Sequence, residues 1–303
     1  MNSIEAMQTE IEYQVQDLQK LEPPSIDKNC LIVGSGDSYV AGLAAQYVSG
    51  SRTICCYPID VVQDPSVING RNVYVVSISG KTKDNILAAR IAIRQGVRIT
   101  AITAKPSSKL ARTCDHLIQL KYRNACVTTA GTISFATSML SCISLVKKVK
   151  LPANLDKIFR QAEKQAELAV GKIISKSSFI ILGNGVLYPA AIYGAFKFNE
   201  ILGARAVAYS ANEFCHSPLF SVKKNDQIIM LGRDSELLNK RFRRERFSSV
   251  HANLKSAGIE LLLESTFFLQ LLVLKLAQRR GLAECYFLKN KKLLKVSSDF
   301  IYD

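Results

Sequence analysis

The sequence lacks a run of apolar residues long enough to cross a membrane. A membrane-spanning helix needs about 20 mostly apolar residues. The most apolar stretch, residues 267–277, is shorter, and Gln278, Arg279 and Arg280 follow it. Residues 1–20 also lack the basic start and the apolar centre of a secretory signal. We therefore expect a soluble, cytoplasmic protein that has no membrane partner.

The sequence also lacks cysteine pairs with the spacing of a metal or redox motif. Its eight cysteines are scattered, and none forms a C-x-x-C motif, so neither a zinc site nor thioredoxin-like chemistry is supported. Most of them stand among apolar residues, as small buried side chains do. This pattern is typical of a reducing compartment, and we predict neither a metal nor an organic cofactor.

Acidic residues are scarce relative to basic ones. The chain has 40 Lys and Arg against 25 Asp and Glu, which gives a net charge of +15. Such a charge favours an anionic partner or a phosphorylated substrate, although a solvated basic surface explains it equally well. The densest basic run, residues 240–246, could contact nucleic acid, but such runs are more often exposed helix faces. We do not expect nucleic acid as a partner.

What the sequence does contain is an alternation of strands and helices, repeated in its two halves. Apolar runs predict strands at residues 30–33, 72–77, 97–103, 116–120, 179–182, 206–209, 226–231 and 259–264. Helices are predicted at residues 4–21, 39–49, 83–95, 129–151, 152–171, 188–202 and over the basic run. Such alternation indicates an α/β fold with parallel, doubly wound sheets. We predict two tandem domains, residues 1–151 and 152–303.

A hydroxyl-rich loop follows the predicted strand at 72–77. Residues 77–82 read Ser-Ile-Ser-Gly-Lys-Thr and lead directly into a helix. The helix N-terminus offers unpaired N–H groups and partial positive charge, so the loop can hold a phosphate. The alternative is an ordinary helix cap, for which serine and threonine are common.

A second loop, residues 34–38, has the same position after the first strand. A dinucleotide site would require G-x-G-x-x-G and an acid about 20 residues further on. Here Tyr39 occupies the third glycine position, and Asp60 lies beyond the expected distance. Two hydroxyl-rich loops in one half are better suited to a single phosphate monoester.

Several motifs together resemble a known family. They are Gly36-Asp37-Ser38-Tyr39, the 77–82 loop, Tyr188-Pro189, residues 194–201 (GAFKFNEI) and residues 213–219 (EFCHSPL). The first half resembles the SIS, or sugar isomerase, domain. The second half resembles the isomerase half of glutamine–fructose-6-phosphate aminotransferase. The resemblance covers about residues 28–235 and implies two tandem SIS domains.

The resemblance assigns roles to individual residues. It implies that Ser38, Ser77, Ser79 and Thr82 bind the sugar phosphate, with Thr132 in a further hydroxyl-bearing loop. Glu200 would move a proton between C1 and C2, with Lys197 beside it. His216 would open the sugar ring from a neighbouring subunit, which implies a homodimer. The spacing of Lys197 and Glu200 agrees, because residues three apart share a helix face. Without the family, the pair could equally be a surface ion pair, and His216 an exposed or capping histidine.

The sequence also departs from the family pattern. Ile78 replaces a polar residue, Lys81 replaces an acid, and Ser217 replaces a glycine. Lys295 is a candidate for the family's Schiff-base lysine, but the proline and arginine of the family's tail are missing around it, and a surface lysine is the alternative. We expect no glutaminase domain in this chain.

These observations predict a sugar-phosphate isomerase acting on a hexose 6-phosphate. Without a glutaminase, deamination of glucosamine 6-phosphate to fructose 6-phosphate, or the reverse reaction with free ammonia, is the favoured reaction. One alternative is a phosphoglucose/phosphomannose isomerase. Another is a non-catalytic regulator that senses a phosphosugar.

Overall fold

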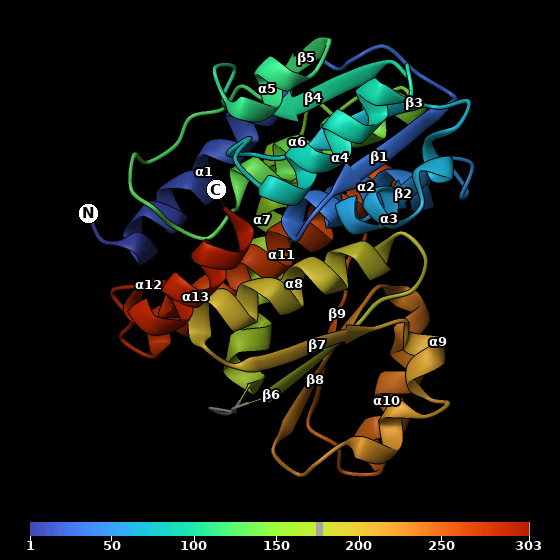
Figure 1. Cartoon of the computed structure of the whole chain (residues 1–303). Helices are drawn as coiled ribbons and strands as arrows, with labels where there is room; N and C mark the ends of the chain where they lie inside the picture. The colour runs from blue at the N-terminus through green and yellow to red at the C-terminus, as the bar shows by residue number, and fades with distance from the viewer. Residues whose placement is uncertain (174–177, 303) are drawn as a thin grey trace. The chain divides into compact units, whose positions relative to one another are not determined.

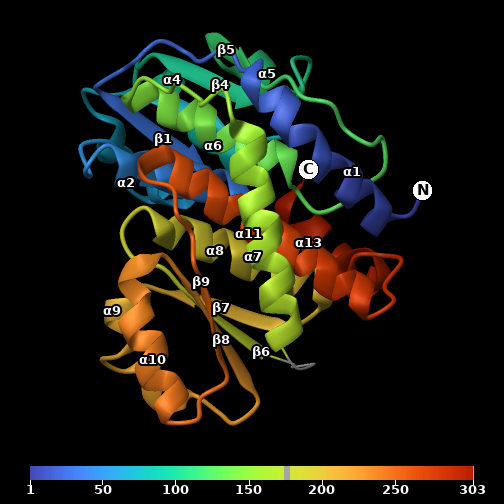
Figure 2. The ribbon, with the colours of Figure 1, turned by 180° about the vertical axis from the view of Figure 1, so that it is seen from behind.

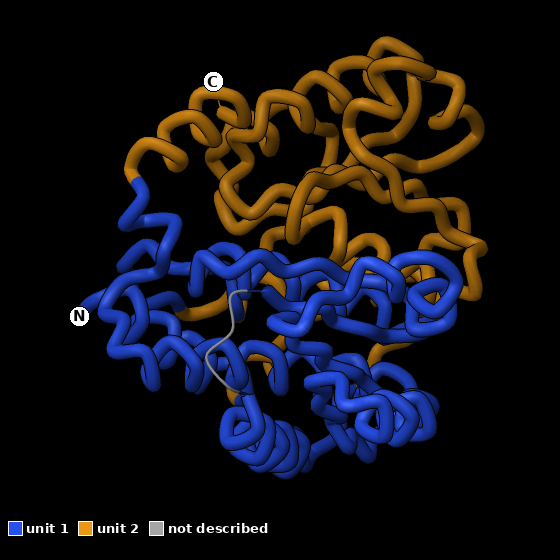
Figure 3. The backbone as a smooth tube through the Cα atoms, turned by 90° about the horizontal axis from the view of Figure 1, so that it is seen from below, with its two compact units in different colours: residues 1–15, 124–132, 151–290 blue, residues 16–123, 133–150, 291–303 orange. Residues whose placement is uncertain are grey.

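The computed structural model describes residues 1–173 and 178–302. The chain divides into two compact units, coloured separately in Figure 3, and each contains one parallel sheet. Unit 1 comprises residues 1–15, 124–132 and 151–290, and unit 2 comprises residues 16–123, 133–150 and 291–303. The predicted α/β fold with two parallel sheets is confirmed. The division at residues 151 and 152 stays a prediction, since each unit takes segments from both sides of it.

Unit 2 contains a five-stranded sheet with the order β2-β1-β3-β4-β5, in which all neighbours are parallel (Figure 1). The strands are β1 (Cys30–Gly34), β2 (Ile54–Cys56), β3 (Asn72–Val76), β4 (Ile99–Thr103) and β5 (His116–Gln119). The helices are α2 (Asp37–Val48), α3 (Pro58–Gln63), α4 (Lys83–Arg94), α5 (Lys109–Thr113) and α6 (Ile133–Val146). Strands β1 and β4 are buried along their whole length, as expected of strands in a sheet covered on both faces.

Unit 1 contains a four-stranded parallel sheet with the order β7-β6-β8-β9. Its strands are β6 (Ser178–Leu182), β7 (Arg205–Tyr209), β8 (Asp226–Leu231) and β9 (Ser249–Ala252). Its helices are α7 (Leu155–Lys172), α8 (Leu187–Leu202), α9 (Ala211–Phe214), α10 (Glu236–Arg244), α11 (Gly258–Arg279) and α12 (Tyr286–Lys289). Helix α11 packs against α7 and α8, which lie together in the reverse view of Figure 2. The first helix, α1 (Ser3–Gln19), begins in unit 1 and ends in unit 2.

The last strand of unit 1 corrects the sequence prediction. The apolar pattern predicts a strand at residues 259–264, but these residues form the first turns of α11, a helix of 22 residues. The strand is instead β9, which contains His251. The cause is the burial of α11 on nearly all sides from Leu262 to Phe268. A short apolar run such as residues 261–263 does not by itself distinguish a buried helix from a buried strand.

The C-terminal residues form a helix, α13 (Lys291–Ile301), within unit 2. After this helix, Tyr302 makes an antiparallel bridge with Thr82. The ammonium group of Lys83 lies 5.1 Å from the ring centroid of Phe300. The C-terminal segment therefore packs against the loop between β3 and α4.

Among the described residues, no helix combines the length and the apolarity that a membrane span requires.

Candidate functional site

The serine-rich loop joins the end of β3 to the start of α4, as the sequence predicts. Ser77 is 3% exposed, and its Oγ accepts a hydrogen bond from the Gly80 N–H at 3.2 Å. The hydroxyls of Ser77 and Thr82 lie 3.4 Å apart. Thr82 is the N-cap of α4, yet its side chain makes no capping hydrogen bond. The loop thus gathers hydroxyls at the positive end of a helix, which is an arrangement suited to a phosphate.

Gly80 is required by this loop for two reasons. Its φ is +61°, in the left-handed region that side chains disfavour. A Cβ at this position would lie 2.1 Å from the Oγ of Ser108. Ser108 is itself fixed, because its Oγ accepts a hydrogen bond from the Ala111 N–H at the start of α5. The tight packing of glycine against Ser108 therefore sets the shape of the loop.

The glycine-rich loop after β1 lies beside the serine loop. Strands β1 and β3 are neighbours, and Gly34 pairs with Val76 where both strands end. Asn85 connects the two loops, because its Nδ2 donates to the Val76 carbonyl at 2.8 Å and its Oδ1 accepts from the Ser35 hydroxyl at 3.3 Å. Ser38 is buried in the first turn of α2. The structure thus places Ser77, Ser79 and Thr82 on the serine loop, and Ser38 in the helix turn that follows the adjacent glycine-rich loop.

The second predicted group lies on α8 of unit 1. The Lys197 Nζ is 2.6 Å from the Glu200 Oε2. The lysine side chain is 1% exposed, whereas that of the glutamate is 39% exposed. A buried ammonium group is stable only when it is paired, so Lys197 holds Glu200 in one orientation. The burial of Lys197 distinguishes this pair from an ordinary surface ion pair, in which both side chains are exposed.

A buried polar network, which the sequence pattern does not reveal, continues from this pair. The Lys197 Nζ lies 5.2 Å from the ring centroid of Tyr193, within the range of a cation–π contact. The Tyr193 hydroxyl donates to the Gly131 carbonyl at 2.8 Å and accepts from the Gln270 side chain at 2.9 Å. Tyr193 therefore links the catalytic candidates on α8 to residues 124–132. These hydrogen bonds of Tyr193 cannot be predicted from the sequence, because a tyrosine in an apolar helix has no distinguishing pattern.

The comparison with known families decides the identity of the fold. The model of the SIS domain matches residues 27–148 and 172–241, which is more than half of the chain. The chain belongs to the SIS domain family. Both the serine loop and the Lys197–Glu200 pair lie within the matched ranges.

Individual relatives agree with this assignment. The glutamine–fructose-6-phosphate aminotransferase of Sulfurisphaera tokodaii is 30% identical over 255 residues, which cover 78% of this chain and 43% of that protein. That of Clostridium acetobutylicum is 26% identical over 248 residues, covering 74% and 40%. This SIS protein therefore spans less than half the length of the curated relatives it matches.

A solved structure covers nearly all of the chain. The C-terminal domain of glucosamine-fructose-6-phosphate aminotransferase from Francisella tularensis matches with a TM-score of 0.72 and 26% identity. The match covers 91% of this chain and 96% of that one. The resemblance of this SIS protein to the isomerase half of the aminotransferase is thereby confirmed.

Two predicted residues of this SIS protein lie on its surface. His216 follows α9 and is exposed, with its backbone N–H bonded to the Glu213 carbonyl at 3.1 Å. Lys295 is exposed on α13, the helix that precedes the Tyr302–Thr82 bridge. The catalytic roles of both residues stay predictions.

Among the described residues there is no cluster of three or more His, Cys, Asp or Glu that could hold a metal.

Thr132 is placed differently from the other phosphate-binding candidates. It is fully buried in unit 1, and its hydroxyl donates to the Glu10 Oε2 at 3.3 Å. The other oxygen of Glu10 accepts from the Ala125 N–H at 3.2 Å. Glu10 thus connects both ends of the segment 124–132 to α1. Phosphate binding by Thr132 stays a prediction.

The environment of Glu10 predicts a pH dependence of stability. Burial raises the pKa of Glu10 above its ordinary 4.5 and outweighs the hydrogen bonds from Ala125 and Thr132, which lower it. A carboxyl with a raised pKa in the folded state stabilises the fold below its unfolded pKa. This contribution disappears as the pH rises through the folded pKa. Urea unfolding should therefore show the wild type losing stability relative to Glu10→Gln as the pH rises above 4.5. A difference that is constant with pH would contradict this expectation.

Proposed function

We propose that this SIS protein binds a hexose 6-phosphate and isomerises it between aldose and ketose forms. The observation that carries the proposal is the Lys197–Glu200 pair, a partly exposed carboxylate 2.6 Å from a buried ammonium group. Aldose–ketose isomerisation needs one base at a C–H bond next to a carbonyl, together with groups that stabilise the enediolate. The pair combines both requirements on one helix.

The proposed mechanism gives each group one task. Ser38, Ser77, Ser79 and Thr82 hold the phosphate, assisted by the N–H groups at the start of α4. Glu200 removes the proton from C1 or C2 of the open sugar and returns it to the other carbon. Lys197 keeps the carboxylate oriented and stabilises the negative charge that develops during transfer. His216 of a second copy opens the sugar ring, so the active species is a homodimer.

The favoured substrates are glucosamine 6-phosphate and fructose 6-phosphate. The relatives to which the chain is similar are isomerizing glutamine–fructose-6-phosphate aminotransferases, and the matched solved domain belongs to a glucosamine-fructose-6-phosphate aminotransferase. We propose that the chain releases ammonia from glucosamine 6-phosphate or adds free ammonia to fructose 6-phosphate. Incubation with each sugar, with and without ammonium, tests this directly. Ammonia release supports a deaminase, whereas interconversion of glucose 6-phosphate and fructose 6-phosphate without ammonia would make the protein a phosphoglucose isomerase.

Removal of the Ser77 hydroxyl should weaken sugar-phosphate binding. Ser77→Ala removes the group that lies between the Gly80 N–H and Thr82. One hydrogen bond to a charged group contributes about 1.5–3 kcal/mol, so the Kd for fructose 6-phosphate should rise by about 10- to 100-fold. Isothermal titration calorimetry measures the change. Ser66→Ala, at an exposed serine of the same unit, is the matched control. Equal affinities for both variants would remove Ser77 from the phosphate site.

A further inference from the structure

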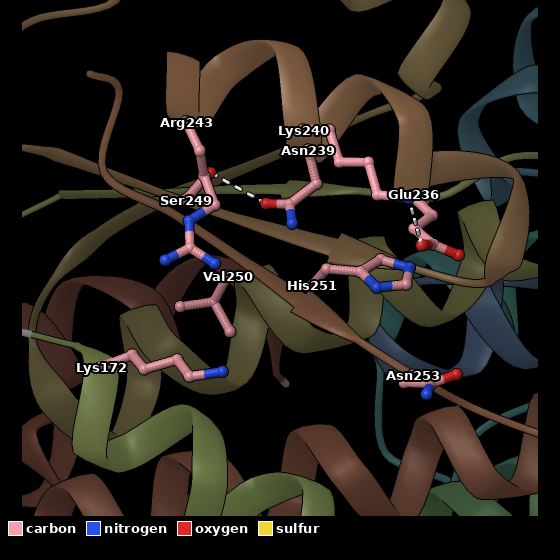
Figure 4. A pocket seen from close by; sticks show the side chains of 9 residues that line it. All are labelled: Lys172, Glu236, Asn239, Lys240, Arg243, Ser249, Val250, His251 and Asn253. Carbon is pink, nitrogen blue, oxygen red and sulfur yellow. Dashed lines mark hydrogen bonds and ion pairs between the residues drawn. The ribbon is translucent and has the colours of Figure 1, made fainter. Parts of the chain in front are cut away.

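A second candidate site lies in unit 1, beside the edge strand β9. A cavity of about 270 Å³ is lined by the end of α7, by α10 and by β9 with the residues after it (Figure 4). It contains none of the residues assigned to the sugar substrate. Two of its residues, Lys240 and Arg243, belong to the basic run at 240–246, which the proposed isomerase mechanism does not use.

The charge of this cavity is unbalanced. Lys172, Lys240 and Arg243 contribute three cations, and Glu236 is the single carboxylate of the lining. Glu236 is already paired, because its Oε1 lies 2.8 Å from the Lys240 Nζ. The hydrogen bond from Lys240, and then the charge of Lys240, lower the pKa of Glu236, so this carboxylate remains ionised at neutral pH. Among the described residues, neither Lys172 nor Arg243 has an ion-pair partner, which leaves the cavity with two uncompensated positive charges.

The remaining lining groups supply hydrogen bonds. The Ser249 hydroxyl donates to the Asn239 Oδ1 at 2.9 Å, which leaves the Asn239 Nδ2 group as a donor. The His251 Nε2 lies 2.7 Å from the Gly232 carbonyl oxygen. Because a carbonyl oxygen only accepts, the His251 Nε2 carries a hydrogen, and this contact fixes the ring in the lining of the cavity. Val250 adds an apolar surface to the lining.

We propose that this cavity binds a small molecule that carries a phosphate group. A phosphate monoester has a charge of about −1.5 to −2 at neutral pH, which matches the two uncompensated cations. The amide and hydroxyl groups are suited to a polar carbon skeleton. The volume lies just below the roughly 300–1,000 Å³ of typical ligand pockets, so the ligand is small.

A small ligand fits these observations better than a nucleic acid does. A nucleic-acid surface follows the phosphate backbone with cations spread over several phosphates. Here only Lys240 and Arg243 of the basic run line the cavity, and the third cation, Lys172, comes from a different helix. The three cations therefore line one partly open cavity, instead of being spread along the surface. The site would give the protein a means of responding to a phosphorylated metabolite other than its substrate.

Histidine NMR of the full chain provides a local test. The protein has three histidines, of which only His251 lines the cavity. Titration with inorganic phosphate at constant ionic strength should shift the His251 imidazole signals in a saturable manner, with His116 as an internal reference. His251→Gln assigns the signal. The double variant Lys172→Gln/Arg243→Gln should weaken the response by about tenfold or more, since it removes two charged hydrogen-bond donors.

Control variants distinguish binding in this cavity from binding elsewhere on the protein. Arg244→Gln removes an exposed cation of the same helix that does not line the cavity, and it should leave the titration unchanged. An equal loss in this control would mean diffuse attraction and would overturn the proposal. So would a response that disappears in Ser77→Ala, because phosphate would then act from the serine loop. A short RNA that binds more tightly than phosphate, and depends on Arg243 and Arg244 alike, would replace the proposed ligand by nucleic acid.

Discussion

Replacing Glu200 by Gln should reduce the isomerase kcat by about 10²- to 10⁴-fold, the usual contribution of a general base. The change removes the group that accepts the proton but keeps its size. The amide oxygen can still accept a hydrogen bond from Lys197, so the buried ammonium group retains a partner. The KM for the sugar phosphate should change little, because the phosphate is assigned to other residues. Steady-state kinetics with fructose 6-phosphate or glucosamine 6-phosphate measures both constants.

Glu260→Gln is the matched control for this experiment. Glu260 is a partly exposed glutamate in the first turn of α11 in the same unit, and it belongs to no predicted motif. Activity close to that of the wild type in this control would exclude a general effect of losing one negative charge. Retention of full activity by Glu200→Gln would refute the assignment of Glu200 as the base. Circular dichroism on both variants would establish that the fold is intact.

Replacing Gly80 by Ala should abolish tight sugar-phosphate binding. A left-handed conformation costs a non-glycine residue roughly 1–2 kcal/mol. In addition, the new Cβ would meet the Oγ of Ser108 at 2.1 Å and its Cβ at 2.4 Å. Either the serine loop or the start of α5 must therefore move. Calorimetry with fructose 6-phosphate should show a loss of affinity of about 100-fold or more, since several donors are displaced together.

Two further variants separate the clash from the backbone strain. Gly96 lies beyond the other end of α4 with a φ of +69°, but a Cβ added there would meet no atom within 4 Å. Gly96→Ala should therefore destabilise the protein by about 1 kcal/mol without changing sugar binding. Gly80→Ala/Ser108→Gly removes the obstructing side chain and should recover part of the affinity. Equal binding by Gly80→Ala and the wild type would show that the loop geometry does not matter for the ligand.

The fold could be predicted where the local pattern of apolar residues matched the way in which the segment is buried in the structure. Strands β1 and β3 are short apolar runs that end in glycine- or serine-rich turns, and the helices after them begin where those turns suggest. The prediction failed at α11 and β9. Residues 261–263 near the start of α11 form a short apolar run, and β9 is a four-residue edge strand with alternating burial. Only packing against the rest of unit 1 distinguishes these two elements.

The candidate site was predictable to the extent that its residues belong to contiguous motifs. The Ser77–Thr82 loop lies at the end of one strand, and the Lys197–Glu200 pair lies on one face of one helix. Sequence spacing alone therefore places the members of each group together. Asn85 and Tyr193 act through contacts with distant segments, and spacing cannot reveal them. Glu10 did leave a signal, since it is a carboxylate beside Met7 and Ile11 on the buried face of α1. A charged residue at such a position indicates a buried polar contact.

The central claim, proton transfer by Glu200 on a bound hexose phosphate, is tested most directly by hydrogen exchange with solvent. The wild type is incubated in deuterated water with fructose 6-phosphate, and deuterium at C1 and C2 is followed by NMR. We predict exchange in the wild type that is lost in Glu200→Gln. If the wild type binds the sugar with Ser77-dependent affinity but no deuterium is incorporated, the protein is a phosphosugar sensor and the isomerase assignment is wrong.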